Sequence, residues 1–106
     1  MVVAVQHGQA LTHGLDEADV FAVVAEGGRV AVQAFYYRNG QHMGNQVYSP
    51  QVPEGEEMGE AMRVFLATHY VQRVPPPFIY CNVAPDEKEM LEEALGVSDG
   101  RRIRIE

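Results

Sequence analysis

The sequence is short of residues that several classes of protein require. Its 106 residues include one cysteine, Cys81, which excludes an internal disulfide and favours a reducing compartment. No apolar run approaches the roughly 20 residues that a membrane-spanning helix needs. The N-terminus begins with apolar residues and has no basic segment before them, which argues against a signal peptide. We therefore expect a cytoplasmic protein without a membrane partner.

Basic residues are scarce as well. Eight lysines and arginines stand against fifteen aspartates and glutamates, for a net charge of −7. A domain that mainly binds DNA usually carries a basic excess, because neutralising phosphates supplies most non-specific affinity. The acids gather in residues 54–60 and 86–93, whereas three arginines lie in the C-terminal RRIRIE. We expect a negative electrostatic potential on the predicted helices and a positive one at the C-terminal end.

The first half of the chain predicts three antiparallel strands. Residues 20–26 form a short apolar run that ends at Gly27-Gly28, a two-residue hairpin signal. Residues 29–37 are apolar on both alternating faces, which indicates a central strand covered on both sides. Asn39-Gly40 predicts a second tight turn, because it supplies the positive φ angles of such a turn. The more polar residues 41–49 then suit an edge strand.

The second half begins with a helix. Residues 56–73 repeat apolar side chains at spacings of three and four, which predicts one apolar stripe. His69 lies on that stripe, and we expect a core histidine with its hydrogen bonds satisfied. The prolines at 75–77 end the helix, and residues 78–83 then predict a short buried strand.

A second helix and a last strand complete the chain. Residues 84–96 predict the helix, with Asp86 and Glu89 as a capping box and Gly96 as the C-terminal cap. The alternating RRIRIE predicts the strand. The order β-β-β-α-β-α-β indicates an α/β (α+β) protein with a mixed five-stranded sheet and helices packed on it, which is the ribonuclease H-like plan. We expect one such domain over residues 19–106, after a poorly ordered lead-in over residues 1–18.

Residues 18–106 resemble the middle region of UvrC, the incision subunit of the bacterial UvrABC nucleotide excision repair system. The residues that carry the resemblance are Val32, Gln33, Phe35, Arg38, Gly40 and Gly44, supported by Phe65, Tyr70 and the prolines before the fourth strand. The resemblance implies an RNase H-like fold between the UvrB-binding motif and the catalytic nuclease domain. It also implies UvrB, DNA and other UvrC domains as partners, and a bacterial cytoplasmic role in the SOS response to DNA damage. Because residues 1–18 match poorly, we expect an excised domain or a truncated paralogue.

RNase H-type nucleases hold two metal ions about 4 Å apart with a cluster of carboxylates. In their pattern one ligand projects from the middle of the first strand, one ends the fourth strand and one comes from a helix. Here the predicted first strand, residues 20–25, contains no acid, and the fourth ends in Cys81-Asn82. Asp19 and Glu26 flank the first strand, about 20 Å apart. We therefore expect no catalytic residue, metal or cofactor. The alternative is a divergent nuclease that uses Asp19, Glu60 and a further acid.

The second predicted hairpin offers candidate contacts with DNA or a partner. Tyr37, Arg38 and His42 lie at its tip, where aromatic rings can stack on bases and arginine can pair with phosphate. Alternatively, the aromatic residues fill the faces of the sheet and Arg38 only shapes the turn. Further candidates are Arg101, Arg102 and Arg104. The sequence leaves three possible functions open: a scaffold domain, a divergent nuclease, and a protein-binding regulator without a DNA role.

Overall fold

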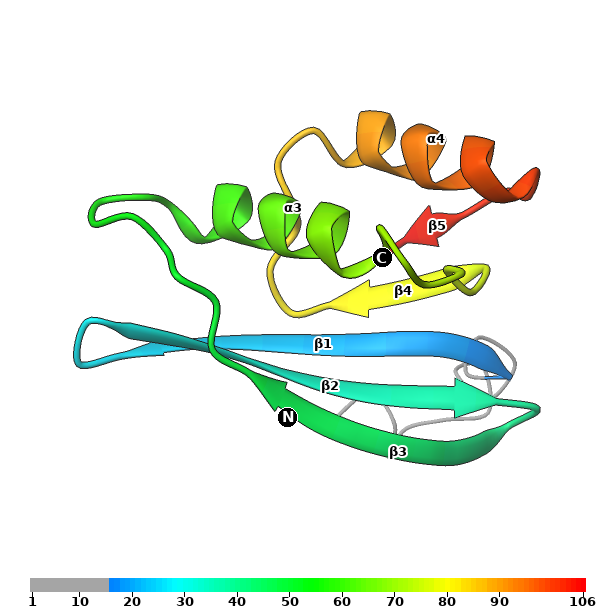
Figure 1. Cartoon of the computed structure of the whole chain (residues 1–106), viewed down its shortest axis with the longest axis horizontal. Helices are drawn as coiled ribbons and strands as arrows, with labels where there is room; N and C mark the ends of the chain where they lie inside the picture. The colour runs from blue at the N-terminus through cyan, green and yellow to red at the C-terminus, as the bar shows by residue number, and fades with distance from the viewer. Residues whose placement is uncertain (1–15) are drawn as a thin grey trace.

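A five-stranded sheet carries two helices on one face in the computed structural model, which describes residues 16–106 (Figure 1). The elements are β1 (Glu17–Glu26), β2 (Arg29–Arg38), β3 (Gln41–Tyr48), α3 (Met58–His69), β4 (Phe78–Cys81), α4 (Lys88–Asp99) and β5 (Arg104–Ile105). The strand order is β3-β2-β1-β4-β5, with β1 to β3 antiparallel and with β4 and β5 parallel to β1. The predicted RNase H-like plan is confirmed, and the polar third strand lies at an edge as expected.

Both hairpin turns form where the sequence predicts them. Gly27 and Gly28 have φ of 59° and 78° and join Glu26 to its cross-strand partner Arg29. Asn39 and Gly40, with φ of 54° and 75°, join β2 to β3 in the same way. These left-handed conformations match the right-handed twist of the two ribbons. The register of the first three strands is therefore set locally.

The first strand begins earlier than the sequence indicated. Glu17 and Ala18 already pair with the end of β2, so the expected lead-in over residues 1–18 does not extend to residue 18. The rest of that lead-in, residues 1–15, lies outside the described residues. The longer strand places Asp19 inside β1 rather than before it, which becomes important for the candidate site.

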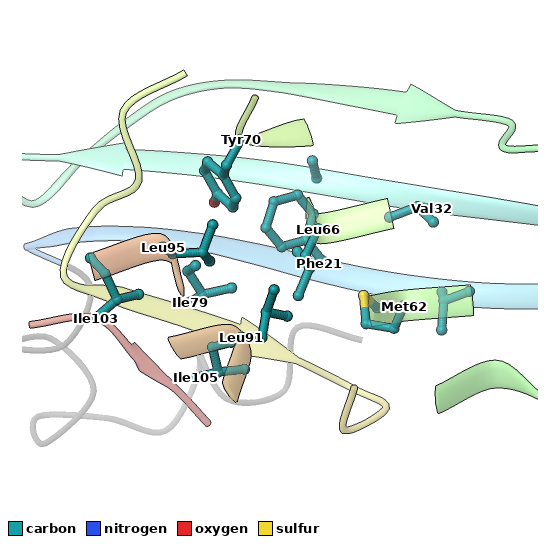
Figure 2. Close-up of a cluster of buried hydrophobic side chains, with 12 residues drawn as sticks. Phe21, Val32, Met62, Leu66, Tyr70, Ile79, Leu91, Leu95, Ile103 and Ile105 are labelled. Carbon is teal, nitrogen blue, oxygen red and sulfur yellow. The ribbon is translucent and has the colours of Figure 1, made fainter. Parts of the chain in front are cut away.

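The core lies between one face of the sheet and the two helices (Figure 2). Its buried members are Phe21, Val23, Val32, Ala34, Met62, Leu66, Tyr70, Ile79, Leu91, Leu95, Ile103 and Ile105. The predicted cover on both faces of β2 is wrong, because both helices pack on the same side. On the opposite face Gln33 is exposed, and Val24 and Val47 are 56% and 61% exposed. No helix within residues 16–106 is long and apolar enough to cross a membrane.

The ends of the helices differ from the predictions. The helix α3 ends at His69, where the backbone N–H of Tyr70 donates to the carbonyl oxygen of Leu66 and that of Val71 donates to the carbonyl oxygen of Thr68. The capping box does not form, because Glu87 occupies the N-cap position with φ of 53° and its side chain makes no capping bond. Gly96 does not end α4, which continues to Gly100. Residue 96 is a glycine for another reason: a Cβ there would lie 2.4 Å from the backbone oxygen of Arg101.

Replacing Gly96 with alanine is therefore expected to destabilise the fold, although alanine is the better helix former. The added methyl group meets backbone that cannot turn away, so we expect a loss of about 1–3 kcal/mol in the free energy of unfolding. Urea denaturation followed by circular dichroism measures it. Val97→Ala is the matched control, because Val97 is 77% exposed on the next position of the helix. An unchanged Gly96→Ala protein would contradict the close approach.

Candidate functional site

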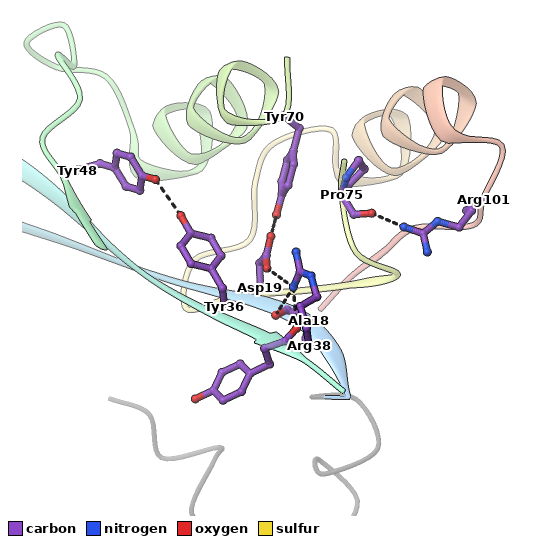
Figure 3. A network of polar contacts seen from close by, with 9 residues as sticks. Ala18, Asp19, Tyr36, Arg38, Tyr48, Tyr70, Pro75 and Arg101 are labelled. Carbon is purple, nitrogen blue, oxygen red and sulfur yellow. Dashed lines mark hydrogen bonds and ion pairs between the residues drawn. The ribbon is translucent and has the colours of Figure 1, made fainter. Parts of the chain in front are cut away.

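Asp19 is the buried acid of the sheet, with 2% of its surface exposed. Arg38, at the end of β2, donates from Nη1 to Oδ1 at 2.9 Å. The hydroxyl of Tyr70, at the end of α3, donates to Oδ2 at 2.5 Å (Figure 3). The expectation of a first strand without an acid is therefore wrong, because pairing of Glu17 and Ala18 extends β1 past Asp19. Asp19, Arg38 and Tyr70, called here the Asp19 triad, join two strands and a helix.

The triad is an ion pair completed by a neutral phenol. Burial raises the pKa of the Asp19 carboxyl, while the hydrogen bonds from Tyr70 and Arg38 and the charge of Arg38 limit that rise. Burial, together with the charge of Asp19, raises the pKa of the Tyr70 hydroxyl. Tyr70 therefore stays protonated and donates its hydrogen bond. A carboxylate with both oxygens bonded in this way is suited to positioning its partners.

The middle of β1 and the end of β4, where a nuclease would need acids, carry other side chains. Asn82 follows β4, and its Oδ1 accepts from the backbone N–H of Val23 at 2.8 Å. Its Nδ2 donates to the carbonyl oxygen of Val23 at 3.0 Å, so the amide extends the parallel pairing. The backbone N–H of Asn82 donates to the carbonyl oxygen of Phe21 at 3.2 Å, and the side chain of Phe21 is 1% exposed. No group of three or more His, Cys, Asp and Glu side chains that could hold a metal occurs within residues 16–106.

The two acids of the alternative nuclease are not brought together. Asp19 precedes Val23 by four residues, which is about 13 Å along an extended strand. Glu60 lies in the first turn of α3, ten residues before Tyr70 and thus about 15 Å along the helix from the triad. Its carboxylate accepts from Nε of Arg63 at 2.8 Å, and the hydrogen bond to Arg63 lowers the pKa of Glu60.

His69 is buried, as predicted, but it is not satisfied. The rings of Phe21, Tyr36, Phe65 and Tyr70 lie within 4.8–6.1 Å of its ring centroid. Its Nε2 has no hydrogen-bond partner among the described residues. Burial, with a smaller contribution from the charge of Arg73, lowers the pKa of His69 to about 4. A histidine that stays neutral in an aromatic enclosure belongs to the packing of the domain.

The contact candidates at the second hairpin lie on opposite faces of the sheet. The rings of Tyr37 and His42 are 5.4 Å apart on the helix-free face, since the two residues are cross-strand partners. Arg38 points to the helix side and pairs with Asp19. Tyr37 and Arg38 are therefore not one contact surface, which follows from the alternation of side chains along a strand.

The C-terminal candidates are placed separately. Arg101 donates to the carbonyl oxygen of Pro75 at 2.7 Å (Figure 3). Arg102 is exposed, and Arg104 pairs with Glu106 at 3.3 Å.

Sequence reasoning missed the role of Tyr70 and the proximity of Arg73 to the triad. The signal for Tyr70 was a polar aromatic residue at the end of an apolar stripe, where a buried hydroxyl needs a partner.

Comparison with known proteins gives a consistent result. Residues 17–106 match the family model of the UvrC ribonuclease H-like domain. The chain is 35% identical over 102 residues to the UvrABC system protein C of Alkalilimnicola ehrlichii, which covers 96% of the chain and 17% of that relative. It is 40% identical over 91 residues to that of Mesorhizobium japonicum, with 86% and 13% covered. The same-named protein of Caulobacter vibrioides is 38% identical over 109 residues, with 94% and 17% covered. The chain thus spans about a sixth of these relatives or less.

Removing the Tyr70 hydroxyl leaves one oxygen of a buried carboxylate without its donor. Tyr70→Phe is expected to lower the free energy of unfolding by about 1.5–3 kcal/mol, the range for hydrogen bonds to charged groups. Tyr36→Phe is the matched control, because it removes a hydroxyl that bonds only to the Tyr48 hydroxyl in a half-buried pair. We expect about 0.5–1.5 kcal/mol there. Equal losses in urea denaturation would show that Asp19 gains nothing special from Tyr70.

His69 should make the protein less stable in mild acid. Its pKa falls from 6.5 to about 4 on folding, so the unfolded chain binds more protons between these values. The stability contribution of the neutral ring is therefore complete above pH 6.5 and is lost as the pH falls to about 4. We expect His69→Phe to reduce the acid-induced loss by about 3 kcal/mol. The exposed His42→Gln is the control, and a pH dependence equal in all three proteins would contradict this assignment.

Proposed function

The chain belongs to the UvrC ribonuclease H-like domain family, and from this premise we propose that it is a catalytically silent domain of an excinuclease subunit. Its role is to hold other domains of the same protein in place while they incise DNA. UvrB and DNA are then partners of the whole protein, and this domain contributes packing and contact surfaces. The relatives are named as protein C of the UvrABC system, and the matched segment is a small part of each.

The single observation that carries the proposal is the engagement of Asn82 with Val23. Magnesium needs hard oxygen ligands in near-octahedral geometry, and RNase H-type catalysis needs several of them together. At the end of β4 the residue is an amide, and the backbone of β1 bonds both of its polar atoms. The neighbouring Phe21, which is bonded to Asn82 through its backbone carbonyl, is an apolar residue with 1% of its surface exposed. The one buried acid, Asp19, lies toward the other end of β1 and is neutralised by Arg38.

The helix-free face of the sheet supports the scaffold role. Phe35, Tyr37, Phe78 and Tyr80 are half-buried on it, with the cross-strand register placing them on neighbouring strands around Ala18 and Val20. Exposed Val24 and Val47 continue this apolar surface. The family members continue far beyond the matched segment, so another domain of the same chain is the partner this face fits. Tyr37 and His42 are then candidates for a domain contact.

A cleavage assay tests the proposal. We expect the purified chain to leave single-stranded and damaged duplex DNA intact in the presence of Mg²⁺ or Mn²⁺, because it has no carboxylate cluster to bind two ions. A known metal-dependent nuclease on the same substrates provides the positive control. Metal-dependent cleavage that disappears in Asp19→Asn or Glu60→Gln, with folding confirmed by circular dichroism, would overturn the proposal in favour of a divergent nuclease.

A further inference from the structure

A recess of about 290 Å³ opens beside the Asp19 triad. Its lining comes from β1, the end of β2 and the segment that follows α3, and consists of Asp19, Tyr36, Arg38, Tyr70, Arg73 and Val74. Two arginines and one carboxylate give this lining an excess of one positive charge. A recess with positive charge and phenol groups is an unusual feature on a chain with a net charge of −7.

Arg38 is held in a fixed orientation at the edge of the recess. Its Nη1 donates to Asp19, to the carbonyl oxygen of Tyr37 at 2.6 Å and to that of Ala18 at 3.4 Å. All three contacts use the same nitrogen. The N–H groups of Nη2 and Nε therefore have no acceptor among the described residues. The side chain of Arg38 is 37% exposed. A guanidinium with one nitrogen anchored keeps its remaining donors for a ligand, and paired N–H groups match the geometry of an oxyanion.

Arg73 supplies the second positive charge. It is exposed, and its one contact in the described chain is a long 3.4 Å bond from Nη1 to the carbonyl oxygen of His69 at the end of α3. Arg73 lines the recess, and its charge limits the rise in the pKa of both Asp19 and Tyr36. Arg73 also offsets the partial negative charge at the C-terminal end of α3, which would otherwise repel an anion.

We propose that this recess binds one phosphate group of a nucleic-acid backbone between Arg38 and Arg73. A phosphodiester carries one negative charge, which matches the excess charge of the lining, and its oxygens accept the free donors of both guanidinium groups. The inference depends on the proposed function in one respect, because that function brings DNA to the domain. It adds a contact that the family match does not assign.

The acids of residues 54–60 lie away from the recess, whereas Asp19 lines it and Glu17 is the cross-strand partner of Arg38. Both helices begin on the side of the molecule opposite the end of β2, so the acids of residues 54–60 are separated from Arg38 by the length of α3 (Figure 1). Twelve residues of helix span about 18 Å, which exceeds the Debye length of about 8 Å at physiological salt. The net charge therefore weakens long-range attraction of DNA without cancelling a local phosphate contact.

Fluorescence anisotropy with a short labelled oligonucleotide tests the site in the 106-residue chain. We expect Arg73→Gln to weaken binding about threefold or more and to reduce the salt slope by about 0.7 for single strands. Arg29→Gln is the matched control, because Arg29 is an exposed arginine at the other end of β2 and its loss changes the net charge equally. Arg38→Gln should weaken binding at least as much, provided that thermal melting shows it folded.

NMR titration of the arginine Nε–H signals identifies the ligand. We expect the signals of Arg38 and Arg73 to shift with the oligonucleotide, and inorganic phosphate to compete only at much higher concentration. Equal losses in Arg73→Gln and Arg29→Gln, or shifts with inorganic phosphate but none with the oligonucleotide, would overturn the inference. If the oligonucleotide neither binds nor is cleaved, the phosphate site is refuted and the proposed function is not. If the oligonucleotide is cleaved, the proposal of a catalytically silent domain is refuted and the phosphate site is not.

Discussion

The buried carboxylate of Asp19 is the constraint around which one end of this domain is organised. An isolated charge is strongly disfavoured away from water, so the carboxylate requires donors on both oxygens. They come from the end of β2 and from the residue that caps α3, segments that are 19 and 51 residues away in the chain. Meeting this requirement fixes where α3 ends on the sheet and how the second hairpin is oriented. The recess beside Arg38 follows from the same geometry.

A different interaction joins β1 and β4 at the point where β4 ends. The last residue of β4, Cys81, lies beside Phe21 in the middle of β1. An amide and large apolar side chains occupy that place, and the amide continues the backbone pairing of the strands. The side chain of Asn82 therefore contributes to the pairing of β1 with β4. Both described helices pack on one face of the sheet (Figure 1), and Val24 and Val47 are exposed on the opposite face.

Much of the fold was predictable from the sequence, because its signals are local. Gly27-Gly28 and Asn39-Gly40 determine two turns by their positive φ angles, and apolar spacing identifies the helices. The start of β1 was not predictable, since Glu17 and Ala18 enter the strand through pairing with β2 and not through their own propensity. The error on Asp19 followed from that boundary. The prediction for Gly96 failed for a similar reason. A glycine near the end of a helical pattern resembles a C-terminal cap, but this glycine is needed because the backbone of Arg101 lies against it, a contact that only the tertiary structure reveals.

The triad also bears on why this domain contains a buried ion pair at all. Replacing such a pair by apolar side chains of similar volume is often neutral or stabilising, so stability alone is a weak explanation for it. The geometry offers a better one. Asp19 engages only one nitrogen of Arg38, whose side chain remains partly exposed at the edge of the recess. The buried carboxylate of Asp19 holds the partly exposed guanidinium of Arg38 in one orientation. On a chain with a net charge of −7, a positive charge has to be held in place in this way to act on a ligand.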